Sequence, residues 1–144
     1  MATANDANRD LLQRLQAVPI FKTLGLKVER MEGGEAVLVA PYAKSYDGIF
    51  ESFHGGLLMT LADTAACVAV LTRAGADAMI TTTDMNIRFL APCNSDATAE
   101  AKIIKYGRTL CPVAVTLRDA KGVEVAIAQV TYMRLGNTPP KQGG

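Results

Sequence analysis

Histidine and closely paired cysteines are scarce in this sequence. It contains one histidine, His54, and three cysteines, Cys67, Cys93 and Cys111, with no paired-cysteine motif. A zinc site draws its ligands mainly from histidine and cysteine, so neither a structural nor a catalytic zinc site is expected. The cysteines also lack the spacing of a disulfide framework. We therefore expect free thiols in a reducing cytoplasm.

Signals of several other function classes are also absent. The net charge is only +1, which gives no electrostatic basis for binding nucleic acid or an anionic membrane surface. No nucleophile elbow, phosphate-binding loop or dinucleotide fingerprint occurs, and the polar residues 1–10 lack the apolar core of a signal peptide. The 144 residues, 49% hydrophobic and 20% charged, instead predict one globular domain.

One apolar stretch, residues 53–75, predicts a central helix that begins near His54 and two glycines. Because it is apolar on nearly every side, we expect the rest of the fold to wrap around it. Its length and its interruptions by Thr and Asp argue against a membrane span. Asp63 is the only charged side chain between His54 and Arg73. A carboxylate there is costly to desolvate, so Asp63 calls for a functional explanation.

The remaining elements predict an α+β fold in which a curled antiparallel sheet wraps one helix. A short helix at residues 8–18 is expected to end at Pro19. Alternation and turn residues predict strands at 24–31, 35–41, 79–90, 97–104, 109–118 and 123–135. Two inward-facing sets are expected on the last two strands: Val113, Val115 and Leu117, then Val123, Val125 and Ile127. We divide the chain into a helical segment (1–20), one domain (21–136) and a disordered tail (137–144).

The start of the central helix is a candidate site for stabilising negative charge. The first N–H groups of a helix lack intrahelical acceptors, and glycine allows a substrate oxygen to approach them. Gly55 therefore has the features of an oxyanion hole. The alternative is that Gly55 and Gly56 only permit close packing against the sheet.

Asp63 and Gly55 are too far apart to act together within one chain. They are separated by eight residues, or about 12 Å along the helix axis. If both act on one carbon atom, a partner subunit must supply one of them. A two-fold dimer with antiparallel central helices would create two such shared sites. The alternative is a structural Asp63 bonded to Thr60 or Thr64.

Other candidate residues have weaker patterns. Cys67 lies thirteen residues from His54 on the same helix, too far for a Cys–His pair, so core packing is expected for it. The basic residues of the late strands are expected on the solvated surface. Lys105 and Arg108, however, flank one glycine turn in a way that could hold a phosphate.

The run H-G-G-L-L-M-T-L-A-D-T-A-A at residues 54–66 resembles the hotdog-fold acyl-CoA thioesterases of the phenylacetyl-CoA type. Further stretches at residues 82–92, 105–110 and 119–132 are similar to the same family. The resemblance extends over residues 24–134 and implies a hotdog fold. It also implies a homotetramer built from two homodimers that hydrolyses an acyl-CoA substrate without a metal or other cofactor.

The resemblance assigns roles to individual residues. Asp63 is expected to act as nucleophile or as general base, with Thr82 of the same chain near the reacting water. The Gly55 N–H of the partner would polarise the thioester carbonyl, and His54 would shape that loop. The expected coenzyme A contacts are Gly56, Phe89, Lys105, Gly107, Arg108 and Thr109.

One position departs from the family pattern. An Asn or Gln is common six residues before the histidine, where Gly48 stands here. Asp47, Glu51, Ser52 or Tyr46 are possible replacements for that amide. Gly48 therefore also supports an alternative function, a non-catalytic acyl-CoA binding module. A hotdog dehydratase or isomerase is less favoured because His54 and Asp63 are widely separated. The acyl group stays open, since the residues that would line an aromatic or medium-chain pocket equally suit the core: Tyr46, Phe50, Phe53, Met59 and Phe89.

Overall fold

The computed structural model describes residues 4–136, so the predicted tail at 137–144 lies outside the described residues. The first half holds α1 (Ala4–Gln16), α2 (Pro19–Leu24), β1 (Lys27–Glu32), β2 (Glu35–Ala40), a 3-10 turn η1 (Lys44–Tyr46) and α3 (Gly55–Ala74). The second half consists of β3 (Met79–Phe89), β4 (Ala97–Ile103), β5 (Leu110–Arg118) and β6 (Glu124–Gly136).

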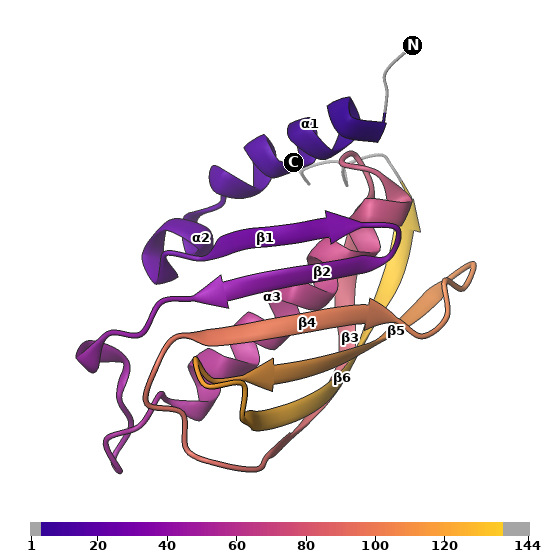
Figure 1. Ribbon diagram of the computed structural model, residues 1–144. Helices are drawn as coiled ribbons and strands as arrows, with labels where there is room; N and C mark the ends of the chain where they lie inside the picture. Colours follow the sequence, from indigo (N-terminus) through magenta and orange to yellow (C-terminus); the bar gives the residue numbers. More distant parts are fainter. Residues whose placement is uncertain (1–3, 137–144) are drawn as a thin grey trace, which may run out of the picture.

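The strands form one six-stranded antiparallel sheet in the order β1-β2-β4-β5-β6-β3. The sheet curls around α3, which crosses one of its faces, while α1 and α2 lie at the β1 end (Figure 1). The prediction of an α+β domain with a curled antiparallel sheet around one long helix is confirmed.

The first helix ends before Pro19, as predicted, but the expectation that the chain then leads directly to a strand at residue 24 was wrong. Pro19 occupies the first turn of α2, where its missing N–H costs nothing and its fixed φ suits a helix. Gly25 then ends α2 with a left-handed φ of 63°, a conformation that glycine adopts without strain. The first strand consequently begins three residues later than predicted, at Lys27.

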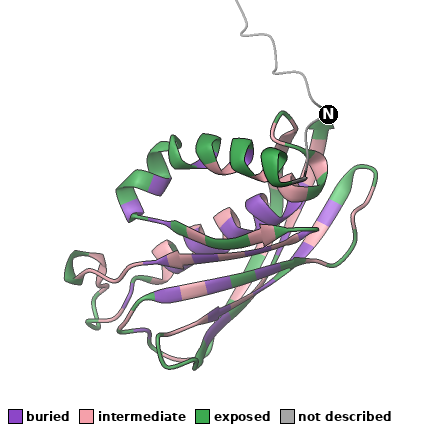
Figure 2. Cartoon of the chain, turned by 45° about the horizontal axis from the view of Figure 1, so that its top comes forward, coloured by how far each residue is buried: buried purple, intermediate pink, exposed green. Residues whose placement is uncertain are grey.

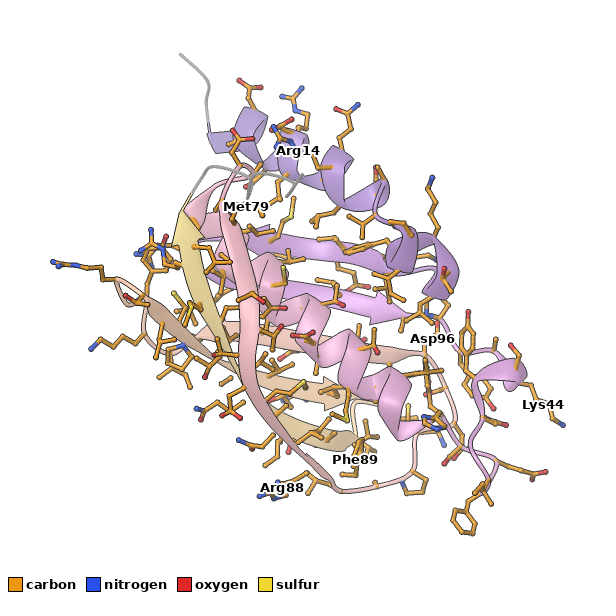
Figure 3. All side chains as sticks on the ribbon, turned by 180° about the vertical axis from the view of Figure 1, so that it is seen from behind. Arg14, Lys44, Met79, Arg88, Phe89 and Asp96 are labelled. Atoms are coloured by element: carbon orange, nitrogen blue, oxygen red, sulfur yellow. The ribbon has the colours of Figure 1, made fainter. Side chains whose placement is uncertain are left out.

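The helix α3 is covered on one side only, contrary to the expectation that it is wrapped on nearly all sides. Its buried residues form a stripe against the sheet: Leu58, Leu61, Ala62, Ala65, Ala66, Val68, Ala69 and Val70. Asp63 and Cys67, on the other side, are only partly buried. Figure 3 shows α3 from behind, with no second layer of described chain in front of it.

Length and composition alone do not exclude a membrane span for α3, as we had expected them to. Its 20 residues have a hydropathy of 1.6 in the most apolar window, which is sufficient for a span. The core helix of a soluble protein meets the same criterion, and 44% of this window is buried within the fold. Figure 2 shows buried positions on α3 and on the strands beside it.

Two β-bulges determine which residues of β3 and β6 face α3. On β3 the pairing moves from Thr82 with Tyr132 to Asp84 with Thr131, so Thr83 is the extra residue. On β6 the extra residue is Val125, between Glu124 and Ala126. A single extra residue exchanges the two faces of a strand.

The bulge in β6 explains why one predicted set of inward-facing residues was wrong. Val123 and Ile127 are largely exposed, and only Val125 of that set is buried. Beyond the bulge the even-numbered residues face inward, and Val130 and Tyr132 are buried. On β5, by contrast, Val113, Val115 and Leu117 are buried as predicted.

The inward-facing stripe of α3 should dominate the stability of the fold. We expect Leu61→Ala, at a fully buried position, to lower the free energy of unfolding by about 2–5 kcal/mol. Leu135→Ala, at a residue that is 55% exposed, serves as a matched control with a loss within about 0.5 kcal/mol. Urea denaturation at equal protein concentration measures both changes. Equal losses for the two variants would contradict this packing.

Candidate active site

His54 forms the N-cap of α3. Its Nδ1 accepts a hydrogen bond of 2.9 Å from the Gly56 N–H, and its carbonyl oxygen accepts from Leu57 and Leu58. The His54 side chain therefore satisfies one of the N–H groups that a helix start leaves open. Within residues 4–136, no acceptor is found for the Gly55 N–H. That N–H lies at the positive end of the helix dipole and is available to a ligand oxygen.

Both glycines at the helix start have close neighbours, which would have to shift slightly to admit a side chain. A Cβ atom at Gly55 would lie 3.1 Å from the ring of Phe89, and one at Gly56 would lie 3.0 Å from His54 Nδ1. Phe89 ends β3, and Figure 3 shows it beside the first turn of α3. Close packing, the alternative reading of these glycines, is therefore real, and it coexists with the free N–H of Gly55.

An open cleft of about 630 Å³ lies beside this helix start. It is lined by Asp47, Gly48, Ile49, Phe50, Ser52, Phe53, His54 and Gly55. Ile49 is 92% exposed and Phe50 is 89% exposed, so the cleft has an uncovered apolar rim. Phe53, in contrast, is buried between Tyr42 and Tyr46 and belongs to the core.

Gly48 lies in this cleft next to His54, where a Cβ atom would be 3.6 Å from the imidazole ring. The position therefore adjoins the helix start, although it has no side chain to offer. Of the possible replacements, the Tyr46 hydroxyl donates to the Thr23 carbonyl oxygen instead. Glu51 is exposed and does not line the cleft. Two residues, Asp47 and Ser52, remain as polar side chains in the cleft.

Asp47 and Ser52 differ in how far they are already engaged. Oδ1 of Asp47 accepts a 2.5 Å hydrogen bond from the Tyr42 hydroxyl, and this bond raises the pKa of Tyr42. The Ser52 hydroxyl is half-buried and has no hydrogen-bond partner among the described residues. Of these two residues, Ser52 is therefore the one whose side chain can turn to a ligand without losing a hydrogen bond.

Asp63 lies midway along α3 and is held by two hydroxyl groups from the sheet. Its Oδ1 accepts 2.8 Å from Thr82 Oγ1 and 2.7 Å from the Tyr132 hydroxyl. Thr82 and Tyr132 are paired across β3 and β6, so both project from the same face of the sheet. The structure thus brings Asp63 and Thr82 together, as expected, and adds Tyr132.

The alternative partners for Asp63 were wrong. Thr60 donates to the Gly56 carbonyl oxygen and Thr64 donates to the Thr60 carbonyl oxygen, as helical threonines commonly do. Tyr132 escaped the sequence analysis because the bulge at Val125 reverses which residues of β6 face inward. No periodicity signal in the sequence marks that bulge.

Cys67 lies one turn beyond Asp63 on α3. Burial raises the pKa of its thiol to about 11, and the nearby Asp63 carboxylate adds to the rise. The thiol is therefore protonated at neutral pH and unsuited to nucleophilic attack. The expected packing role of Cys67 agrees with this environment.

The turn at residues 105–109 lies near the C-terminal end of α3. A Cβ atom at Gly107 would collide with the Leu110 carbonyl oxygen, so only glycine fits there. Two guanidinium groups stack on the ring of Tyr106: that of Arg73 lies 4.5 Å and that of Arg134 4.3 Å from the ring centroid. Arg134 also donates to the Gly107 carbonyl oxygen.

Positive charge gathers around this turn without matching acids. Arg108 and Arg134 line a small cleft of about 140 Å³. In the described range 4–136, no ion pair with an acid is formed by any of the four basic residues here: Arg73, Lys105, Arg108 and Arg134. Thr109 is exposed beside them, and its carbonyl oxygen accepts from the Arg134 N–H. Across the whole described range, residues 4–136, no group of three or more His, Cys, Asp or Glu side chains could hold a metal ion.

The sequence is similar to known thioesterases. The model of the thioesterase superfamily matches residues 50–126, more than half of the chain. The chain belongs to the thioesterase superfamily. This thioesterase is 31% identical to human acyl-coenzyme A thioesterase 13 over 143 residues, which include 95% of this chain and 100% of the human protein.

Solved structures agree with the family assignment at the level of the fold. The E. coli PaaI protein from the phenylacetic acid degradation operon superimposes with a TM-score of 0.86 at 23% identity, over 95% of this thioesterase and 99% of PaaI. A thioesterase protein of Streptococcus pneumoniae TIGR4 with coenzyme A gives a TM-score of 0.75 at 22% identity. The superposition includes 91% of this thioesterase and 98% of the S. pneumoniae chain. The fold is the hotdog fold, and the protein is a thioester hydrolase.

The environment of Cys67 predicts how this thioesterase reacts with alkylating reagents. We expect iodoacetamide to modify Cys67 in the native protein only slowly at pH 7.5 and much faster as the pH approaches 11, because the thiolate is the reactive form. Peptide mass spectrometry after timed labelling measures the rate. Urea-unfolded protein is the control, because its exposed thiols have the ordinary cysteine pKa of about 8.5. Labelling of native Cys67 at pH 7.5 as fast as in urea would contradict this environment.

Proposed function

We propose that this thioesterase hydrolyses acyl-CoA thioesters at a site shared between two chains. Asp63 of one chain acts as nucleophile or general base, and the Gly55 N–H of the partner binds the carbonyl oxygen. The observation that carries this proposal is the pairing of two features on one helix. One is a half-buried carboxylate held by two hydroxyls, and the other is a helix start with a free N–H.

The need for a partner follows from the helix itself. Gly55 and Asp63 are about 12 Å apart along a rigid axis, whereas reacting atoms must approach to about 3 Å. Two surfaces of the described chain support a dimer. The side of α3 that carries Asp63 is uncovered, and β3 pairs with β6 alone, leaving one edge open. We propose a homodimer with antiparallel α3 helices, two of which assemble into a homotetramer.

Both proposed reactions consume one thioester and one water molecule. As a base, Asp63 takes a proton from water while the water oxygen attacks the carbonyl carbon; the C–S bond then breaks and the leaving thiolate receives that proton. As a nucleophile, Asp63 forms a C–O bond while the C–S bond breaks and the thiolate leaves; water then hydrolyses the mixed anhydride, which frees the acid and the Asp63 carboxylate and supplies the proton for the thiolate. In either case the Gly55 N–H stabilises the negative oxygen of the tetrahedral intermediate.

We place the nucleotide end of coenzyme A at the turn formed by Lys105, Gly107, Arg108 and Thr109. The surplus of positive charge there supports this placement, because guanidinium groups bind phosphates in a planar, two-pronged manner. Tyr106 holds Arg73 and Arg134 in the same cluster. Gly56 and Phe89, at the helix start, are proposed to contact the pantetheine end.

The cleft beside Gly48 is the proposed place of the acyl group. Its exposed rim at Ile49 and Phe50 supports an apolar acyl chain or an aromatic ring. We propose that Ser52 offers the hydroxyl that replaces the missing amide at Gly48. A phenylacetyl substrate is one member of this class, supported by the fold shared with PaaI. The free thiols support a cytoplasmic location. We propose residues 21–136 as the thioesterase domain.

The central experiment is thiol release from a panel of aryl- and alkyl-CoA thioesters. We expect turnover by the wild type and a loss of at least about 10³-fold in kcat for Asp63→Asn, because the amide neither attacks nor accepts the proton. Asp10→Asn, on the exposed face of α1, is the matched control with unchanged activity. Tight binding of acyl-CoAs without thiol release would favour the non-catalytic binding module instead.

The role of the Gly55 N–H can be isolated with two variants. Gly55→Pro removes the N–H at a first-turn position that proline tolerates, and the extended ψ of 129° at His54 suits a following proline. Gly55→Ala adds the same Cβ atom beside Phe89 but keeps the N–H. We expect kcat of the proline variant to be about 10²–10³-fold below that of the alanine variant. Equal kcat values in the two folded variants would exclude the Gly55 N–H as oxyanion donor.

A further inference from the structure

We propose that Tyr132 is a positioning residue that, together with Thr82, fixes Oδ1 of Asp63 and leaves Oδ2 as the reacting oxygen. This inference rests on the proposed function, because it assigns the chemistry of Asp63 to one of its two oxygens. It adds a residue to which the sequence motifs gave no role and which lies outside the family match at residues 50–126.

The two hydroxyl groups converge on the same oxygen atom. Tyr132 and Thr82 lie 2.7 Å and 2.8 Å from Oδ1 of Asp63. Both distances are those of a hydrogen bond between a hydroxyl donor and a carboxylate. With a bond from its own carbon, Oδ1 has two lone pairs in the carboxylate plane, so two donors occupy it.

The Tyr132 hydroxyl also restrains the position of the whole Asp63 residue. It lies 3.1 Å from the Asp63 backbone carbonyl oxygen as well as 2.7 Å from Oδ1. One hydroxyl thus contacts the residue at its backbone and at its side chain. Rotation of the carboxylate about its side-chain bonds would break the shorter contact and the bond from Thr82 together.

Burial keeps Tyr132 in the donating form. The residue is only 5% exposed, and this burial raises the pKa of its hydroxyl well above the ordinary value. It therefore remains a donor throughout the pH range in which a thioesterase operates. The raised pKa of the Cys67 thiol likewise keeps that neighbour uncharged, so no second anion competes beside Asp63.

The other carboxylate oxygen has no such partners. In the part of the chain that the structure describes, no donor lies within hydrogen-bond distance of Oδ2 of Asp63. Because Asp63 is only half-buried, Oδ2 is the oxygen left for water or for the thioester carbon. As a base, Oδ2 takes the proton of the attacking water and returns it to the leaving thiolate. As a nucleophile, Oδ2 forms the C–O bond while the C–S bond breaks.

The test compares variants that remove one donor at a time. Tyr132→Phe removes only the hydroxyl, Thr82→Val removes the second donor, and Thr82→Ser restores it. We expect Tyr132→Phe and Thr82→Val each to lower kcat by about 10–100-fold, with KM within about twofold of wild type. Thr82→Ser should retain nearly full kcat. Thr23→Val, which removes an exposed hydroxyl bonded to the Pro19 carbonyl oxygen on α2, is the matched control with unchanged kcat.

Two further measurements separate positioning from stability and from the proposed function. Thermal unfolding identifies a temperature at which every variant is folded, and kcat is compared there. Crystal structures of wild type and Tyr132→Phe show whether the Asp63 carboxylate leaves its original rotamer, a readout that needs no activity. An unchanged carboxylate together with kcat within about twofold of wild type would overturn the role of Tyr132. Absence of turnover in wild type, with the carboxylate displaced in the variant, would instead refute the proposed function alone.

Discussion

The rigid spacing of Gly55 and Asp63 on α3 is the constraint on which the proposed account depends. A helix fixes both the distance and the relative direction of its residues, and eight residues separate these two by about 12 Å. The free N–H of one helix start and the carboxylate of the same helix cannot meet at one carbonyl group. The uncovered side of α3 and the open edge of β3 are where a second chain would bring them together.

The sheet contributes to the site through its irregularities rather than through its regular pairing. The bulge at Thr83 leaves Thr82 facing α3 while moving Asp84 to the exposed face. The bulge at Val125 turns Tyr132 toward the same point. Two neighbouring hydroxyl groups thereby reach one carboxylate that would otherwise be costly to hold in a partly buried place. Inward-facing apolar residues on the same strands maintain the core around them.

Much of the fold could be predicted because local chemistry and tertiary packing agree in most of the chain. Period-two patterns identified all six strands, and the apolar run after His54 identified α3. Pro19 shows where local reading fails, since the same residue either ends a helix or begins one. One-sided burial of α3 was missed because composition does not distinguish two cases. A helix that its own chain encloses and a helix that a partner chain would cover are equally apolar.

Residue spacing alone predicted the candidate site mainly in its helical part. The helix motif placed His54, Gly55 and Asp63 at fixed spacings, and family resemblance added Thr82. Tyr132 depends on the strand register, and Arg73 and Arg134 depend on the stacking around Tyr106. These are contacts between residues distant in the sequence, which no local pattern encodes. Gly48 stays a predicted departure from the family pattern, and the structure shows that it lines the cleft beside His54.

Complementation between two inactive variants is the most direct test of a shared site. Asp63→Asn and Gly55→Pro chains are co-expressed and purified together, so that about half of the dimers contain one chain of each kind. In such a dimer one site combines the Asp63→Asn change of the first chain with the Gly55→Pro change of the second and is inactive. The other site combines the unchanged Asp63 and Gly55 and is intact. Because half of the dimers are mixed and half of the sites in each are intact, the mixture should recover about one quarter of wild-type kcat per chain, although each variant alone is inactive. A mixture as inactive as its components would contradict a site built from two chains.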